Sequence, residues 1–154
     1  MTDDPAVYLR DVTGADEEIF YQHQLDPEAT AMAAFTARDR QSHKAHWAKI
    51  VADESVTKAI IVDGEVAGNI VSWVQDDHLE LGYWVGRPFW GRGIATKAVA
   101  QFLQLVTERP LFAWVADVNG GSVRVLEKCG FTLADKQPEP TPEGVKYLVF
   151  ELRA

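Results

Sequence analysis

The sequence has a single cysteine, no long apolar run and fewer basic than acidic residues. The lone Cys129 among 154 residues excludes an internal disulfide framework and is consistent with a reducing cytoplasm. No apolar run approaches the roughly 20 residues that a membrane span requires. Residues 1–14 also contain no apolar core of a signal peptide. We therefore expect a cytoplasmic protein with no membrane partner.

Negative charge outweighs positive charge along the chain. The 23 acidic residues against 15 lysines and arginines give a net charge of -8 at pH 7. This balance argues against binding to nucleic acid or to an anionic membrane, because both require a positive surface. An anionic ligand must therefore be held by a local feature, whereas a cationic substrate would be tolerated.

The length and the hydrophobic content of 47% suit one domain over residues 1–154. Apolar periodicity predicts an α/β (α+β) fold in the order β-α-α-β-β-β-α-β-α-β-β, with a mixed, mostly antiparallel sheet. Residues 27–41 are interpreted as a loop that enters a helix. The other elements are expected at 6–13 (strand), 15–25 and 38–53 (helices), 57–74 (hairpin about Asp63-Gly64), 78–86 (strand), 94–106 (helix), 111–118 (strand), 119–130 (helix), and 131–137 and 145–152 (strands).

The stretch GRPFWGRGIATKA, residues 86–98, places three glycines directly before a strongly helical pattern. Glycine is costly near a helix start unless the backbone must adopt a special conformation or approach a ligand closely. A glycine-rich turn that opens a helix presents unpaired N–H groups at the positive end of the helix dipole, where anions bind. The stretch therefore predicts a phosphate or pyrophosphate site between Trp90 and Thr96. Three basic residues could screen its charge: Arg87, Arg92 and Lys97.

Other phosphate-binding motifs fit this stretch less well. The Walker pattern GxxxxGK[ST] is absent. The G-x-G-x-x-T of residues 91–96 lacks the third small residue of the dinucleotide fingerprint, and the chain is short for a two-halved dinucleotide fold. A module that binds ATP or NAD remains an alternative, as does a tight turn under an amphipathic helix.

Residues 79–131 resemble the GNAT superfamily of acyl-CoA-dependent N-acetyltransferases. LELGYWVGRPFWGRGIATKAV and VNGGSVRVLEKCGF are similar to the branch that acetylates the N-termini of ribosomal proteins. The resemblance implies that the turn at 91–96 binds the pyrophosphate of acetyl-CoA through backbone amides. It also implies that strands 79–86 and 111–116 splay apart to admit the pantetheine arm. The implied cofactor contacts are Tyr83, Trp84, Val85, Gly91, Arg92, Gly93, Ile94, Ala95, Thr96, Asn119 and Ser122.

Two positions depart from the superfamily pattern. The superfamily pattern has Gln or Arg three residues before the first glycine of the turn, and this sequence has Pro88 there. Proline has no backbone N–H to donate to the cofactor. Leu126 stands where many members have a tyrosine that acts as general acid, although the ribosomal-protein branch commonly lacks that tyrosine too. Arg124 and Lys128 are expected at solvated helix positions, from which one of them could reach the cofactor's 3′-phosphate.

Transfer of an acyl group to an amine requires a neutral nitrogen nucleophile. At pH 7 a lysine-like amine costs roughly 4–5 kcal/mol to deprotonate, and an α-amine only about 1 kcal/mol. Positioning two bound reactants can supply about 7–11 kcal/mol, whereas a general base contributes about 10²- to 10⁴-fold in rate. We therefore expect orientation to dominate catalysis, and loss of the base to damage activity without abolishing it.

Three side chains are candidate catalytic groups. Glu80 is either the base, acting through water, or an exposed carboxylate on its strand. His78 shares a strand face with Glu80 and is the substitute base. Ser122 either hydrogen-bonds the departing thiolate or caps the helix that follows it. A backbone N–H near Trp84 could polarise the thioester carbonyl.

The sequence therefore predicts an N-acetyltransferase that moves an acetyl group from acetyl-CoA to a primary amine by direct attack in a ternary complex, without a metal. The amine belongs to a protein N-terminus or to a small molecule. A non-catalytic acyl-CoA-binding or sensing domain is the alternative. Residues 20–50 are expected to form much of the acceptor pocket, and the protein is expected to be a monomer or homodimer. Three acidic residues there could attract a cation: Asp26, Glu28 and Asp39.

Overall fold

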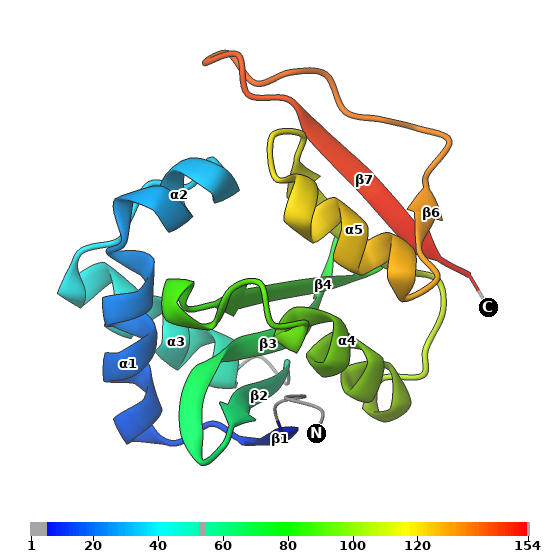
Figure 1. Ribbon diagram of the computed structural model, residues 1–154. Coiled ribbons are helices and arrows are strands. Elements are labelled where there is room, and N and C mark those ends of the chain that lie inside the picture. The colour runs from blue at the N-terminus through cyan, green and yellow to red at the C-terminus, as the bar shows by residue number, and fades with distance from the viewer. Residues whose placement is uncertain (1–5, 53–54, 154) are drawn as a thin grey trace.

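The computed structural model describes residues 6–52 and 55–153 and shows helices packed on a seven-stranded sheet (Figure 1). The strand order is β1-β2-β3-β4-β5-β7-β6. β4 and β5 are parallel, and the other neighbouring pairs are antiparallel. This arrangement confirms the predicted mixed, mostly antiparallel sheet. The strands are β1 (Val7–Asp11), β2 (Val56–Val62), β3 (Glu65–Gln75), β4 (His78–Val85), β5 (Leu111–Ala116), β6 (Thr132–Leu133) and β7 (Tyr147–Leu152).

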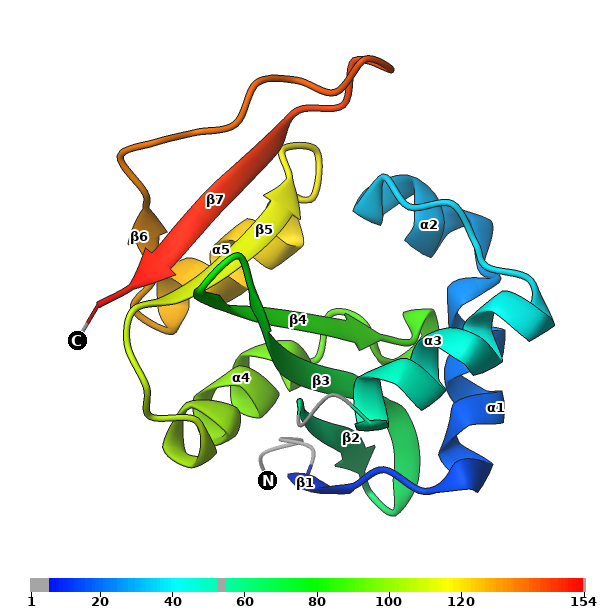
Figure 2. The same cartoon turned by 180° about the vertical axis from the view of Figure 1, so that it is seen from behind.

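The helices lie on the two faces of the sheet (Figures 1 and 2). Within the described ranges, no helix has the length and apolarity needed to cross a membrane. The helices are α1 (Gly14–Gln24), α2 (Pro27–Ala33) and α3 (Arg40–Ala52) on one face, and α4 (Ile94–Leu105) and α5 (Gly120–Lys128) on the other, with a short 3-10 turn η1 (Arg87–Phe89) before α4.

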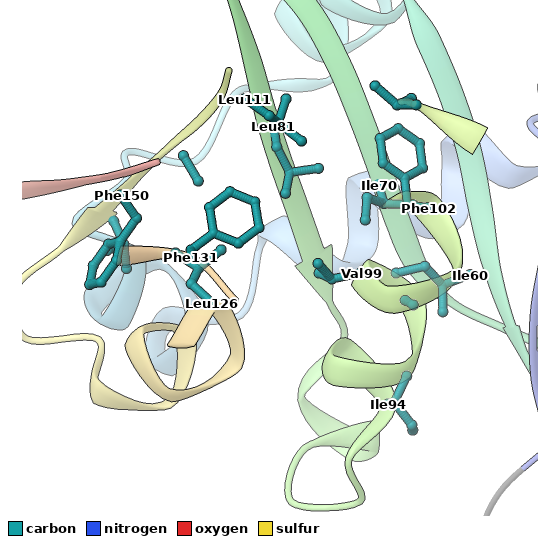
Figure 3. Close-up of a cluster of buried hydrophobic side chains, with 14 of the residues drawn as sticks. Ile60, Ile70, Leu81, Ile94, Val99, Phe102, Leu111, Leu126, Phe131 and Phe150 are labelled. Atoms are coloured by element: carbon teal, nitrogen blue, oxygen red, sulfur yellow. The ribbon is translucent and has the colours of Figure 1, made fainter. Parts of the chain in front are cut away.

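Two apolar clusters fix the helices on the sheet. In the larger cluster, Phe102 of α4 packs with side chains of the sheet and of α5 (Figure 3). The smaller cluster joins Phe20 of α1 and Trp47 of α3 to the opposite face of β2. Successive β2 residues divide between the clusters, Ile60 in the larger and Ile61 in the smaller, because strand side chains alternate between faces.

The expectation of a loop over residues 27–41 was wrong in its first part, because Pro27–Ala33 form α2. The Asp26 carboxylate accepts hydrogen bonds from the backbone N–H groups of Glu28 and Ala29, at 2.9 and 3.5 Å. Pro27 occupies the first helical turn, where its missing N–H costs nothing. The capping signal Asp-Pro was therefore present in the sequence, but a seven-residue, alanine-rich helix has too little apolar periodicity to be recognised.

Gly68 lies where β3 and β4 approach too closely for a side chain. A Cβ atom at Gly68 would lie 2.0 Å from the carbonyl oxygen of Trp84. We expect Gly68→Ala to lower the free energy of unfolding by about 1–3 kcal/mol, because β4 must shift away. Gly14→Ala is the control, because no described atom lies within 4 Å of a Cβ there. Urea denaturation of both variants checks this, and an equal stability change in the two would contradict it.

Candidate functional site

β4 and β5 are paired with each other only over their first residues. Their ladder joins Leu79–Leu81 to Leu111–Ala113, after which β4 continues to Val85 and β5 stays paired with β7. Figure 2 shows the two strands diverging from this common start. The predicted splay between these strands is therefore present.

A cleft of about 690 Å³ is lined by the last residues of β4, the glycine turn and the start of α5. The described lining residues include every predicted cofactor contact except Arg92. They also include residues that the sequence did not indicate, of which Ala29, Met32 and Ala33 come from α2. The cleft thus brings together the two segments, 79–99 and 118–131, that carry the sequence resemblance.

The glycine turn exposes bare backbone to this cleft. Gly91 and Gly93 have φ angles of 76° and 72°, a region that side chains other than glycine adopt only with strain. No described atom lies within 4 Å of a Cβ built at either position. Gly93 is the N-cap of α4, so the residues whose N–H groups have no acceptor within that helix line the cleft, at the positive end of the helix dipole. This geometry suits an anion.

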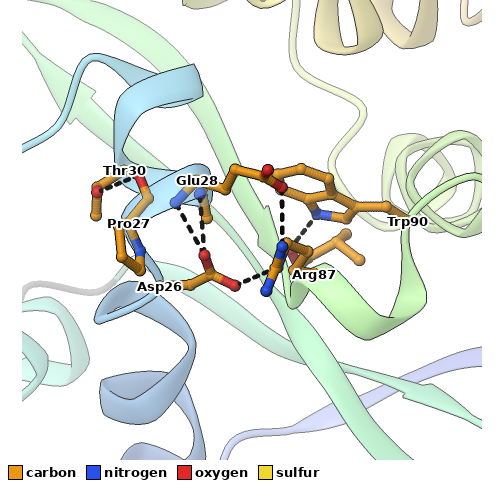
Figure 4. A network of polar contacts seen from close by, with 8 residues as sticks. Asp26, Pro27, Glu28, Thr30, Arg87 and Trp90 are labelled. Carbon is orange, nitrogen blue, oxygen red and sulfur yellow. Dashed lines mark hydrogen bonds and ion pairs between the residues drawn. The ribbon is translucent and has the colours of Figure 1, made fainter.

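Arg87, which precedes the turn, and Arg92, which lies within it, both form ion pairs with carboxylates. The Arg87 guanidinium lies 2.7 Å from the carboxylate of Asp26 and 2.9 Å from that of Glu28 (Figure 4). The Arg92 guanidinium lies 3.5 Å from the Asp63 carboxylate. The roles predicted for these side chains, screening of a phosphate by Arg87 and attraction of a cation by Asp26 and Glu28, stay predictions. The ion pairs of Arg87 tie α2, which lines the cleft, to η1.

The positive side chains that line the cleft come from α5. Arg124 and Lys128 both lie along its wall at exposed positions, as expected for solvated helix residues. A contact of one of them with the cofactor's 3′-phosphate stays a prediction. The N–H groups of the turn carry only partial positive charges. Among the described residues that line the cleft, Arg124 and Lys128 are the two that carry a full positive charge. They are therefore the groups best placed for additional phosphate contacts.

Trp84 lines the same cleft and carries a buried hydrogen-bond donor. Its indole Nε1 is buried and has no hydrogen-bond partner within the described part of the chain. The indole ring meets the ring of Phe35 edge-on, with centroids 5.4 Å apart. A buried N–H without a partner costs about 1–3 kcal/mol, so a ligand oxygen that accepts from it gains that amount.

Tyr83 and Ser122 join β4 to α5 across the cleft. The Tyr83 hydroxyl lies 2.5 Å from Ser122 Oγ, and burial raises the pKa of Tyr83 to about 12. Tyr83 therefore keeps its proton, and either of the two hydroxyl groups can be the donor in this contact. Asn119 Oδ1 accepts from the Ser122 N–H at 3.2 Å, so Asn119 is the helix cap. Leu126 is buried in the core with 1% of its side chain exposed.

Glu80 lies in a second, smaller cavity of about 240 Å³ at the start of the strand separation. Burial raises the pKa of Glu80, and the nearby Asp76 carboxylate adds to this while His78 opposes it. His78 is exposed, with its ring edge-on to Phe112 at 5.1 Å. The structure therefore groups Ser122 with the cofactor contacts, and places Glu80 and His78 beside this second cavity. The cavity is lined by Trp73, Gln75, Glu80, Leu81, Gly82 and Trp114.

Nothing in the described chain resembles a metal centre, because no group of three or more His, Cys, Asp or Glu residues there could hold a metal ion.

The chain was compared with known families and structures. A model of the acetyltransferase (GNAT) domain matches residues 6–132. A comparison with curated proteins gives no match.

Several solved structures share the fold at low sequence identity. The structure of spermidine N-acetyltransferase from Vibrio cholerae with CoA and spermine is 13% identical, with a TM-score of 0.81 over 96% of this chain and 95% of that one. RimL, a ribosomal alpha-N-protein acetyltransferase in complex with coenzyme A, is 16% identical, with a TM-score of 0.80 over 96% and 93%. An aminoglycoside acetyltransferase with coenzyme A and kanamycin is 17% identical, with a TM-score of 0.75 over 94% of both chains.

Proposed function

The chain belongs to the GNAT acetyltransferase family, and we propose that it transfers an acetyl group from acetyl-CoA to a primary amine. The observation that carries the proposal is the meeting of the bare glycine turn and the separating strands in one cleft. Similar structures that hold coenzyme A with spermine or kanamycin support it. The proposal treats residues 1–154 as one N-acetyltransferase domain; its cytoplasmic location and its state as monomer or homodimer remain predictions.

The cleft fits coenzyme A by the chemistry of its donors. Backbone N–H groups of residues 91–96 suit the pyrophosphate, and the side chains of Arg124 and Lys128 suit further phosphate charge. The unpartnered indole N–H of Trp84 suits an amide oxygen of the pantetheine arm. Asn119 also lines the cleft; its Oδ1 caps α5, and its amide N–H₂ is the group proposed to contact the pantetheine arm.

Acetyl-CoA supplies an acetyl thioester that an amine can attack directly in a ternary complex. Glu80 is the proposed base and accepts the proton of the amine through water, with His78 as the substitute. Ser122 is the proposed donor to the departing thiolate: in the proposed arrangement the Tyr83 hydroxyl donates to Ser122 Oγ, and the serine hydroxyl donates to the thiolate sulfur. The chain's main contribution is orientation, since positioning outweighs proton transfer in magnitude.

Tyr83→Phe tests the role assigned to the Tyr83–Ser122 hydrogen bond. We expect kcat to fall about fivefold with little change in the KM for acetyl-CoA, because one hydrogen bond that orients Ser122 is lost. Ser122→Ala is expected to lower kcat at least as much. Steady-state kinetics of the double variant then distinguishes the roles. If Tyr83 acts through Ser122, the double variant equals Ser122→Ala, whereas effects that multiply would show that Tyr83 acts independently.

Two measurements test the proposed function itself. Isothermal titration with acetyl-CoA should show binding, and a panel of amines should show release of free thiol. Binding without thiol release on peptides, polyamines or aminoglycosides would favour a sensing domain, which Leu126 at the position of the family tyrosine also favours. Displacement of acetyl-CoA by ATP would favour the nucleotide-binding alternative, and no binding at millimolar acetyl-CoA would reject the proposal.

A further inference from the structure

The cavity around Glu80 lies where β4 and β5 part. Leu81 and Ala113 are the last residues paired between these strands, and the cavity wall consists of Leu81, Gly82 and Trp114 at that point. The cleft, in contrast, is lined by Tyr83 and the residues that follow it on β4. Along β4, the residues that line the cavity come directly before those that line the cleft. The cavity therefore lies at the point where β4 and β5 begin to separate.

Two tryptophans flank the Glu80 carboxylate in this cavity. Trp73 is the cross-strand partner of Glu80, and residues so paired place their side chains on the same sheet face. A Cβ at Gly82 would lie 3.1 Å from two atoms of the Trp73 ring, so the ring lies over the bare glycine. Its Nε1 donates to Gln75 Oε1 at 3.1 Å, which fixes its orientation. Trp114, with 53% of its side chain exposed, lines the cavity from β5.

The charges around the cavity favour a cation. Within residues 6–52 and 55–153, no lysine or arginine forms an ion pair with Glu80. Asp76 and Asp77 lie on the exposed β3–β4 turn next to it, and the exposed His78 is the titratable nitrogen beside them. A half-buried carboxylate between aromatic rings is stabilised by a positive charge, which indole faces also attract.

We propose that this cavity is the acceptor pocket and recognises an unbranched primary alkylammonium group through Trp73, Trp114 and Glu80. The inference rests on the proposed function and specifies its substrate class. The volume of about 240 Å³ lies below the roughly 300–1,000 Å³ of sites for whole drug-sized ligands. The pocket therefore suits the ammonium end of an unbranched alkyl chain. The α-ammonium of a peptide fits less well, because it carries a branch and a carbonyl group next to the charge.

The test is binding of three small probes to protein saturated with coenzyme A, so that no turnover occurs. Titration with n-hexylammonium should release heat, and 1-hexanol, which has the same chain without charge, should bind at least about tenfold more weakly. Alaninamide, an α-ammonium on a branched carbon, should also bind more weakly. Equal binding of hexylammonium and hexanol, tighter binding of alaninamide, or no binding of hexylammonium would overturn the inference. Failure of coenzyme A itself to bind would overturn the proposed function instead.

Variants at Trp114 identify the contribution of its ring. Trp114→Leu should weaken hexylammonium binding about 3- to 10-fold, because the π face is lost, while Trp114→Phe should retain most of it. The Kd for coenzyme A should be unchanged in both, which also shows that they fold. If the two variants bind hexylammonium equally, whether weakened or unchanged, the aromatic recognition is wrong. Turnover of hexylamine against Nα-acetyl-lysine amide then distinguishes a free amine from a lysine side chain as the source of the alkylammonium.

Discussion

Gly93→Asp is expected to weaken the binding of acetyl-CoA roughly 100-fold, whereas Gly93→Asn should weaken it only a few fold. Asp and Asn have nearly the same size, and both tolerate a positive φ such as the 72° of Gly93 better than most residues. They differ in charge alone. Two charges about 4 Å apart near a protein surface interact with about 4 kcal/mol, so a carboxylate at an occupied pyrophosphate site must reduce affinity.

Isothermal titration of both Gly93 variants measures this difference, and thermal unfolding without ligand provides the control. A negative charge at a helix N-terminus stabilises the helix, so Gly93→Asp should unfold at no lower temperature than Gly93→Asn. Gly144→Asp introduces the same charge at a φ of 85° in the loop before β7 and should leave affinity unchanged. Equal dissociation constants for the Asp and Asn variants at Gly93 would mean that the turn holds no anion.

Glu80→Gln is expected to lower kcat about 100-fold with the affinity for acetyl-CoA unchanged. The variant retains the shape of the side chain and loses its ability to accept a proton. Residual activity should remain, because positioning of the two reactants is intact. His78→Gln is the comparison variant from the same strand face, and its kcat should stay close to that of the natural protein.

The pH dependence of kcat/KM separates a base from a binding group. Glu80 must be ionised to accept a proton, so activity falls as the pH decreases through its pKa. Burial raises that pKa above its usual 4.5, which moves the acid limb of the profile to higher pH. Glu80→Gln should lack this limb. If the limb persists in Glu80→Gln and disappears in His78→Gln, His78 is the base.

The sequence predicted the parts of the site that depend on local patterns. The glycines at 91 and 93 need positive φ, and the alternation along 78–86 placed Leu81 and Glu80 on opposite faces of one strand. Both signals come from residues next to one another in the chain. These two signals were sufficient to predict the turn, the helix that follows it and the strand that leads into it.

The parts that the sequence did not predict depend on contacts between distant residues. Arg87 forms an ion pair with Asp26, and the Tyr83 hydroxyl is hydrogen-bonded to Ser122 Oγ. The apolar periodicity of the sequence predicts neither contact. The position of Trp73 beside Glu80 follows from the register of β3 on β4, which is set by the hairpin and by the packed core. The cavity around Glu80 therefore could not be predicted from local sequence patterns.

A crystal structure of the protein with acetyl-CoA tests the central claim most directly. The account predicts that oxygens of the pyrophosphate accept hydrogen bonds from backbone N–H groups of residues 91–96, and that the acetyl group lies between the diverging strands, next to the Glu80 cavity. A turn without phosphate, or a coenzyme whose acyl arm lies outside the separation of β4 and β5, would contradict it.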